Sequence, residues 1–372
     1  MIVTNSEVGM DRNIYFRKME ETANTIAPVI MDSFEYLKNE NPELYRSVTA
    51  LPKKRLEKGT ILRPFLLRCS YGVVGNESES DDWIYPAAAN ELFNISTYTA
   101  NKILEGEKDK SEIKRELITN IIQRELASKI LRNGCDESKY KDIEGLIGDT
   151  ALNGYSEFYR ELDLEYNDSY NNFKDSLERY LDRCYNFSGK FLENISKSGG
   201  ILADADDEQI KNLAKYGKDL GLIVQIMNDV GDFVPPETGA FDIEKGYQDQ
   251  YKDITSGKLT YPVLWVLEYG NKDDRKIIDN VIGNKEAKPE QLLNLTEMLV
   301  KSGAIDATKN LAKGYAREAN SHLDIFEKTE HRNSLKIMTQ VCRTTKYLRA
   351  LYEYRDDQTV NNDHLIESIL EV

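Results

Sequence analysis

Apolar residues recur at helical spacing along almost all of the 372 residues, and this periodicity restricts the possible folds more than any other feature. No stretch shows the alternation of apolar and polar residues that is typical of a strand. The chain has only 9 prolines and 22 glycines, so few residues interrupt the helical pattern. The sequence therefore predicts an all-α protein that is long enough to bury a sizeable core.

The periodic segments predict helices at these approximate ranges: 11–40, 61–76, 85–105, 111–133, 138–164, 172–199, 207–233, 260–269, 275–283, 289–302, 304–328 and 335–354. Residues 355–372 are predicted to form a polar tail after a helical domain that spans residues 1–354. The segment 234–252 contains two prolines and is predicted to be a loop of the kind that closes over a functional site.

The charge of the chain excludes some partners. A formal net charge of −15 disfavours nucleic acid or an anionic membrane surface as the main partner. The N-terminal residues lack the pattern of a signal peptide, and no apolar stretch reaches membrane-spanning length. We therefore expect a cytoplasmic protein. The four scattered cysteines and three histidines have no zinc-site or catalytic-triad spacing, so buried reduced thiols are expected.

The segment from Gln225 to Asp232 follows an apolar helical run, residues 220–224, and is rich in side-chain oxygens. Gln225 and Asp229 are four residues apart, and Asp229 and Asp232 are three apart, so the three share one helix face. With Asn228, they place carboxylates and amides where burial without a cation is costly. Oxygen ligands of this kind suit Mg²⁺, so the sequence predicts a magnesium site here.

Four segments in order carry a family resemblance. Their ranges are 59–64, similar to GGKRLRP; 148–152, similar to GDxLL; 216–233, similar to YGxxLGLAFQIxDDxxDF; and 252–262, similar to GxDLxxGKxTLP. On these motifs the chain resembles the trans-polyprenyl diphosphate synthases from about residue 58 to residue 354. The resemblance implies the isoprenoid synthase fold, a single large helical bundle around a central cavity.

The resemblance also implies a chemistry, the Mg²⁺-assisted departure of diphosphate from an allylic prenyl diphosphate, with an apolar cavity around the carbocation. The residues it implies for catalysis are Asp229, Asp232 and Lys258. Those implied as metal ligands are Asn228, Asp232, Asp253, Asn101 and Glu105. Those implied for binding the substrate diphosphate are Arg63, Lys190, Lys258 and Gln225. The expected partners are a prenyl diphosphate and a second subunit, in a homodimer or in a heterodimer with a related synthase.

The acidic motifs depart from the family pattern. The first DDxxD motif falls on Asn101 and Glu105, with Lys102 where a second carboxylate is expected. The pair either keeps a weakened Mg²⁺ contact or is a solvated helix end. The second motif has Asn228 in place of its first aspartate. Each lost charge-assisted contact is worth roughly 1.5–3 kcal/mol, so these changes predict weaker binding or slower turnover.

The cationic positions depart as well. The lysine and arginine of the GGKR motif fall on Thr60 and Ile61, so only Arg63 remains to bind isopentenyl diphosphate. The phosphate-binding lysine of the family's KTGALF motif falls on Phe187. Lys190 follows almost one helical turn later, where it either substitutes in part or is a surface lysine.

Three interpretations remain open. The first is an enzyme that ionises a prenyl diphosphate, as a prenyl transferase or with terpene-synthase-like chemistry. The second is a catalytically degenerate subunit that pairs with an active synthase and regulates it. The third is an unrelated helical protein whose acidic helix end is structural. If the first holds, the bulky Tyr98, with Asn94 and Thr97, predicts a shallow cavity and a short prenyl chain.

Overall fold

The computed structural model describes residues 5–57, 61–75, 80–104, 110–162, 172–233 and 250–343. All regular elements in these ranges are helices, and none of the ranges contains a strand, which confirms the predicted all-α class. The chain forms two compact units. The first comprises Met1–Thr150, Asn194–Ala214 and Leu323–Ile337, and the second comprises Ala151–Glu193, Lys215–His322 and Met338–Val372.

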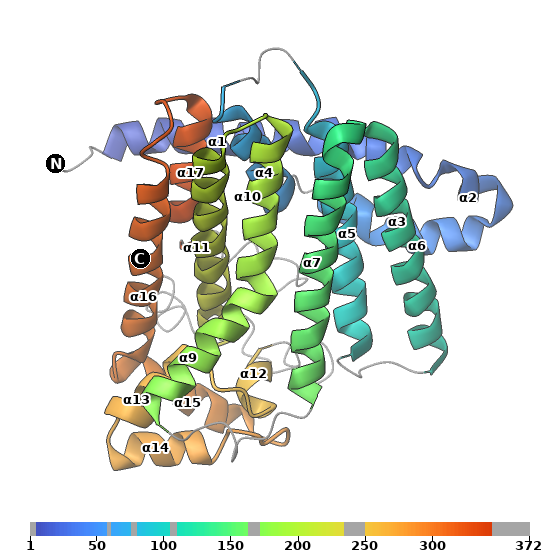
Figure 1. The fold of residues 1–372 in the computed structure, drawn as a ribbon. Helices are drawn as coiled ribbons and strands as arrows, with labels where there is room; N and C mark the ends of the chain where they lie inside the picture. Colours follow the sequence, from blue (N-terminus) through green and yellow to red (C-terminus); the bar gives the residue numbers. More distant parts are fainter. Residues whose placement is uncertain are drawn as a thin grey trace. The chain divides into compact units, whose positions relative to one another are not determined.

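The first unit is built largely from the N-terminal helices (Figure 1). They are α1 (Asn5–Asp32), α2 (Glu35–Glu40), α3 (Pro42–Glu57), α4 (Leu62–Gly72), α5 (Ile84–Leu104), α6 (Lys110–Gly134) and the beginning of α7 (Glu137–Leu162). Helices α5 and α6 pack side by side, and α1 contacts α3, α4 and α5. The fully buried residues Ala87 and Ala88 of α5 have small side chains that allow neighbouring helices to approach closely.

Helix α3 corrects the predicted pattern, in which residues 41–60 carried no helix. Pro42 occupies the first helical position, where its fixed φ is favourable. Pro52 lies inside the helix and has no N–H to donate to the carbonyl of Val48. The side-chain amide of Gln123 on α6 donates to that carbonyl at 3.0 Å instead. A contact between distant parts of the chain thus allows a helix that the local sequence argues against.

The second unit contains α9 (Phe173–Cys184), the π-helical turn η1 (Tyr185–Gly189), α12 (Lys252–Thr255), α13 (Tyr261–Tyr269), α14 (Lys272–Asp279), α15 (Pro289–Lys301) and α16 (Ala304–His322). Three further helices have residues in both units: α10 (Lys190–Leu202), α11 (Asp207–Gly231) and α17 (Glu330–Val341). Helix α13 contacts α9, α14, α15 and α16, and its fully buried Val263 and Leu264 contribute to the core of this unit.

The π turn interrupts what the sequence predicted as one helix over residues 172–199. The N–H of Lys190 donates to the carbonyl of Tyr185, five residues earlier, and this spacing defines the turn. Helix α11 approaches the turn closely at Gly221, where a Cβ would collide with the Ser188 carbonyl and lie 2.6 Å from the Cα of Gly189. Glycine at position 221 therefore allows η1 and α11 to come into backbone contact.

Most of the remaining predicted helices agree with the structure to within a few residues. The predicted helix 11–40 is instead two helices, α1, which begins at Asn5, and α2, with a break at residues 33–34. Helix α16 ends six residues early, and α17 spans Glu330–Val341, whereas residues 344–354 of the last predicted helix lie outside the described part of the chain. The short helix α12 was not predicted. Most of the predicted loop 234–252 and the whole predicted tail lie outside the described residues, so the domain boundary at residue 354 and the central cavity stay predictions. No helix in the described ranges combines the length and apolar character needed to cross a bilayer.

Candidate functional site

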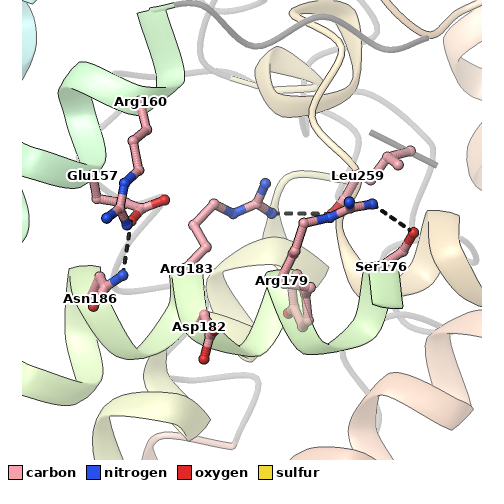
Figure 2. Close-up of a pocket in the computed structure, with 9 residues that line it drawn as sticks. Glu157, Arg160, Ser176, Arg179, Asp182, Arg183, Asn186 and Leu259 are labelled. Carbon is pink, nitrogen blue, oxygen red and sulfur yellow. Dashed lines mark hydrogen bonds and ion pairs between the residues drawn. The ribbon is translucent and has the colours of Figure 1, made fainter. Parts of the chain in front are cut away.

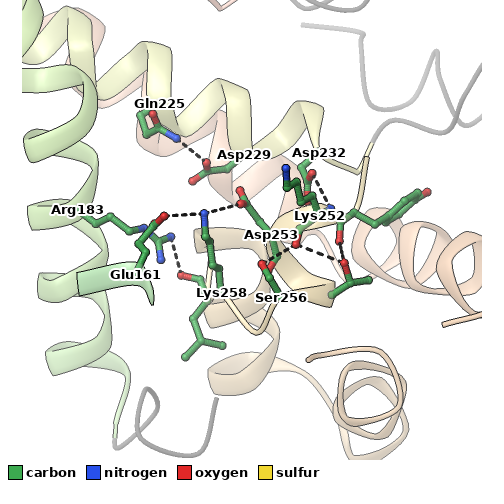
Figure 3. Close-up of polar contacts among 12 residues, drawn as sticks. Glu161, Arg183, Gln225, Asp229, Asp232, Lys252, Asp253, Ser256 and Lys258 are labelled. Carbon is green, nitrogen blue, oxygen red and sulfur yellow. Dashed lines mark hydrogen bonds and ion pairs between the residues drawn. The ribbon is translucent and has the colours of Figure 1, made fainter. Parts of the chain in front are cut away.

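Four carboxylates of the second unit form what we call the acidic cluster: Glu161, Asp229, Asp232 and Asp253 (Figure 3). Asp229 comes from the last turn of α11, and Asp232 directly follows its final residue, Gly231. Asp253 comes from α12 and Glu161 from the end of α7. Asp229 is 2% exposed and Asp232 is 7% exposed. The helical spacing of the two α11 aspartates, as predicted, places both in one buried region.

Asp232 joins α12 to the end of α11. Its carbonyl accepts from the N–H of Tyr251 at 2.9 Å, and its Oδ1 accepts from the N–H of Lys252 at 3.2 Å. Tyr251 adopts a left-handed φ of 57°, which is costly for a residue with a side chain. Its ring is fully buried, and its hydroxyl pairs with that of Thr296 at 2.7 Å, so tertiary packing holds this conformation.

Asp229 is held by two donors. The hydroxyl of Tyr180 on α9 donates to its Oδ2 at 2.7 Å, and Nε2 of Gln225 donates to its Oδ1 at 3.1 Å. The Oε1 of Gln225 in turn accepts from the hydroxyl of Ser188 at 2.9 Å, which the close approach at Gly221 makes possible. Both ends of the Gln225 amide are therefore used within the protein, and this side chain positions Asp229.

Three cations lie near the acidic cluster: Lys258, Arg183 and Lys252, whose charge acts on Asp253 (Figure 3). Lys258 Nζ lies 2.9 Å from Glu161 and 3.2 Å from Asp253. The guanidinium of Arg183 on α9 donates to the carbonyl of Leu259 at 3.2 Å, next to Lys258. The predicted residues Asp229, Asp232, Asp253 and Lys258 are thus brought together.

Known proteins are similar to this chain in the region of the acidic cluster and beyond it. The family model for polyprenyl synthetase matches residues 152–299, a range that contains the whole acidic cluster. The geranylgeranyl diphosphate synthase of Sulfolobus acidocaldarius is 26% identical over 324 residues, which cover 83% of this chain and 91% of that protein. Its counterpart from Saccharolobus solfataricus is 26% identical over 84% of this chain and 91% of its own length.

Residues 152–299 thus match the polyprenyl synthetase family, and the similarity to geranylgeranyl diphosphate synthases extends over most of the chain.

Solved structures agree on the fold. The geranylgeranyl pyrophosphate synthetase from Pyrococcus horikoshii matches with a TM-score of 0.73 and 21% identity, over 89% of this chain and 98% of that one. A polyprenyl synthase from Caulobacter crescentus, solved with calcium and isoprenyl diphosphate, matches with a TM-score of 0.73 and 18% identity, over 88% and 96% of the two chains. At this identity the likeness establishes the isoprenoid synthase fold.

The structure gives less information about the other residues that the family motifs predict. The side chain of Asn101 and the residue Glu105 lie outside the described part of the chain. Arg63 lies on α4, in the first unit, and is partly buried. Lys190 begins α10, and its Nζ pairs with Glu193 at 3.2 Å. The roles predicted for these four residues stay predictions.

The buried aspartates of α11 favour their protonated forms. Burial, together with the nearby charge of Asp253, raises the pKa of Asp229 to about 7, although Arg183 and Tyr180 oppose the shift. Burial and the charges of Asp253 and Asp229 raise the pKa of Asp232 well above its ordinary value. Positive charge in this region would therefore be needed to keep both aspartates ionised near neutral pH.

Asp253 and Lys258 remain charged. Burial alone would raise the pKa of Asp253, but Lys258 and Arg183 outweigh it and lower that pKa. Burial alone would lower the pKa of Lys258, but Asp253 and Glu161 raise it above its ordinary value. This ion pair is thus a fixed part of the site, whereas Asp229 and Asp232 respond to what is bound.

Two oxygens of the second motif fit a hard divalent cation. Asn228 Oδ1 and Asp232 Oδ2 are buried and have no hydrogen-bond partner among the described residues. Within those residues, no group of three or more Asp, Glu, His or Cys side chains is arranged to hold a metal ion. Mg²⁺ typically uses one or two carboxylates and completes its shell with water and substrate phosphate, so a cage of protein ligands is not required.

Next to the acidic cluster is a pocket of about 320 Å³ between α7 and α9, which we call the arginine pocket (Figure 2). Its lining residues are Glu157, Arg160, Ser176, Arg179, Tyr180, Asp182, Arg183, Asn186 and Leu259. The sequence analysis missed Tyr180, Arg183 and Glu161. The four-residue spacing of Arg179 and Arg183 within a predicted helix is a signal that would have found one face of the pocket.

Proposed function

We propose that this protein is a polyprenyl diphosphate synthase-like enzyme that promotes the departure of diphosphate from an allylic prenyl diphosphate with the help of Mg²⁺. The observation that carries the proposal is the buried end of α11, where Asp232 Oδ2 and Asn228 Oδ1 have no hydrogen-bond partner among the described residues. The match of residues 152–299 to the polyprenyl synthetase family model and the similarity to geranylgeranyl diphosphate synthases support it.

The proposed mechanism assigns Asp232 and Asn228 to hold the metal. When bound, Mg²⁺ supplies positive charge to the leaving diphosphate. Lys258 supplies a second positive charge, and its ion pairs with Asp253 and Glu161 fix its position before substrate arrives. Tyr180 and Gln225 hold the carboxyl of Asp229 in one orientation, so little reorganisation is needed when the cation charge ionises it.

The acceptor of the prenyl group is the second half of the reaction, and here Thr60 and Ile61 replace the cations of the GGKR motif. We infer that the chain ionises an allylic substrate and passes the prenyl cation to an acceptor other than isopentenyl diphosphate, or cyclises it. A dimeric assembly and a cytoplasmic location belong to the same proposal, by analogy with the family.

The test is incubation of the pure protein with Mg²⁺ and geranyl, farnesyl or geranylgeranyl diphosphate, with and without isopentenyl diphosphate. We expect diphosphate release from at least one allylic substrate, and its loss in Asp232→Ala. Asp273→Ala, which changes an exposed aspartate of α14, is the matched control and should retain full activity. Absence of release from every allylic substrate would contradict the proposal. Activity that appears only after addition of a related synthase would support the regulatory-subunit alternative.

A further inference from the structure

The hydroxyl of Thr296 lies at the centre of a buried hydrogen-bonded chain in the second unit. Thr296 belongs to α15, and its Oγ1 donates to the carbonyl of Phe233 at 3.1 Å and pairs with the hydroxyl of Tyr251 at 2.7 Å. A threonine hydroxyl has one hydrogen to donate. Since that hydrogen goes to Phe233, the Tyr251 hydroxyl donates to Thr296, and the direction of the chain of hydrogen bonds is fixed.

The two residues that Thr296 contacts are neighbours of the acidic cluster in the sequence. Phe233 directly follows Asp232, and Tyr251 lies two residues before Asp253. The N–H of Tyr251 donates to the carbonyl of Asp232 at 2.9 Å. Tyr251, Thr296, Phe233 and Asp232 therefore form a closed cycle of covalent and hydrogen bonds, which we call the Thr296 network.

The Thr296 network is shielded from solvent. Tyr251, Thr296 and Phe233 are fully buried, and the rings of Phe233 and Tyr251 meet edge to face, with 6.2 Å between their centroids and 73° between their planes. A buried hydrogen-bonding group is costly to leave without a partner, because no water replaces the one that is lost. The packing around Thr296 therefore favours the arrangement in which its hydroxyl joins the other two residues.

The Thr296 network holds a backbone conformation that is otherwise unfavourable. The φ of Tyr251 is 57°, in the left-handed region that residues with a side chain rarely adopt. From this conformation the chain enters α12, and the N–H of Lys252 donates to Oδ1 of Asp232 at 3.2 Å. If Tyr251 relaxed to a right-handed φ, α12 would begin in a different direction and this hydrogen bond would be lost. The anchoring of the Tyr251 hydroxyl on Thr296 therefore stabilises the junction between Asp232 and α12.

This junction sets the orientation of the Asp232 carboxyl. Its Oδ1 accepts from the N–H of Lys252, whereas its Oδ2 is buried and has no hydrogen-bond partner among the described residues. A carboxylate that is fixed through one oxygen presents the other oxygen in a defined direction, as binding of a hard divalent cation requires. Thr296 acts on this carboxyl through the backbone of Phe233 and Tyr251.

We propose that Thr296 is a positioning residue for the divalent cation at the end of α11. Its hydroxyl fixes the conformation of Tyr251, and through it the direction in which Asp232 presents its oxygens. Groups that orient a metal ligand without binding the metal commonly change metal affinity by about 10–100-fold. The cation itself rests on the proposed function, whereas the Thr296 network rests on the contacts of the described residues alone.

The test is calorimetric titration of the full chain with Mn²⁺ in place of Mg²⁺, alone and with inorganic pyrophosphate. We expect Thr296→Val, which keeps the branched shape but removes the hydroxyl, to raise the Kd for Mn²⁺ about tenfold or more. Thr296→Ser keeps the hydroxyl and should stay within about threefold of the wild type. Thr308→Val is the matched control, because Thr308 is a fully buried threonine of α16 whose hydroxyl donates to the Ala304 carbonyl at 2.8 Å, and it should leave the Kd unchanged.

A second variant separates positioning from a purely structural role of Thr296. Thr296→Val leaves the buried Tyr251 hydroxyl without this acceptor, and Tyr251→Phe in that background removes the hydroxyl as well. We expect the double variant to recover part of the lost free energy of unfolding in urea titrations, because replacing both partners of a buried hydrogen bond costs less than replacing one. The Kd for Mn²⁺ should stay raised, because the connection to Thr296 is still missing.

Two results would overturn the proposal. One is a folded Thr296→Val protein that binds Mn²⁺ as tightly as the wild type. The other is a double variant in which Mn²⁺ affinity returns together with stability. If Thr296→Val does not fold, Tyr251→Phe alone provides the test: we expect it to raise the Kd for Mn²⁺ about threefold or more, and an unchanged Kd would count against the proposal.

Turnover assays separate this proposal from the proposed function. If Thr296→Val weakens Mn²⁺ binding while the wild type turns over no allylic diphosphate, the positioning role stands and the proposed function fails. If the wild type releases diphosphate and Thr296→Val needs the same Mg²⁺ concentration for half-maximal rate, the proposed function stands and the positioning role fails. A wild-type protein that binds no Mn²⁺, with or without pyrophosphate, would contradict both.

Discussion

The two units differ in how their buried carboxylates are paired with cations. In the first unit, the fully buried Glu91 of α5 accepts from Arg55 Nε at 2.9 Å, and the Arg55 guanidinium also lies 4.9 Å from the centre of the Tyr98 ring. This buried acid is in direct contact with a cation. In the second unit, the four carboxylates of the acidic cluster share three cations, Lys258, Arg183 and Lys252. A buried acid that is paired with a cation is part of the structure. A group of buried acids that outnumber their cations is a site to which a further cation can bind.

The largest expected effect on stability comes from changing Glu91, the acid that is paired with Arg55. Glu91→Gln leaves Arg55 without its charged partner in a mostly buried position, so we expect the free energy of unfolding to fall by about 3 kcal/mol in urea titrations. Glu297→Gln, which breaks an exposed pair with Lys301, is the control and should change it by less than about 0.5 kcal/mol. A loss at Glu91 as small as the control would remove the contrast between the units.

Substitution of Asp232 should change the stability of the protein in the opposite direction. Asp232→Asn removes a carboxyl whose pKa is raised well above its ordinary value by burial and by the charges of Asp253 and Asp229. In metal-free buffer at pH 8 we expect this variant to be more stable than the wild type by at least about 1 kcal/mol, although it is predicted to be inactive. Destabilisation of a size similar to that of Glu91→Gln would show that Asp232 is structural.

Asp229 predicts a dependence of stability on pH. Burial and the charge of Asp253 raise the pKa of its native carboxyl to about 7, whereas the unfolded carboxyl titrates near 4. Since the native state then binds more protons than the unfolded state between these values, the contribution of Asp229 to the free energy of unfolding falls as the pH rises through this window. Asp229→Asn should make that decline shallower by at least about 1 kcal/mol in metal-free urea titrations at pH 4 and pH 7. An unchanged decline would contradict the raised pKa.

The smallest effect is expected at Lys190, which the sequence predicted to bind diphosphate. Its Nζ pairs with Glu193 of the same helix at 3.2 Å, so we expect Lys190→Gln to change the KM for a prenyl diphosphate less than about twofold. A rise above about tenfold, without a matching change in Glu193→Gln, would place Lys190 at the substrate.

The sequence alone was sufficient for the helical class and for the acidic end of α11. Both depend on local spacing: apolar side chains at intervals of three and four residues define a helix face, and Asp229 and Asp232 share a face because they are three residues apart. The motifs around Asp253 and Lys258 also identified the partners that α12 and the turn after it bring to that face.

Only the tertiary structure decided how the charges are matched. Tyr180 reaches Asp229 across 49 residues of sequence, and no local pattern marks Glu161 as a partner of Lys258. Helix α3 persists around Pro52 because Gln123, 75 residues from Val48, replaces the missing hydrogen bond. Helix periodicity is set by the backbone over a few residues, but the pairing of a buried acid with a cation depends on which helices pack together, and that is a property of the folded chain.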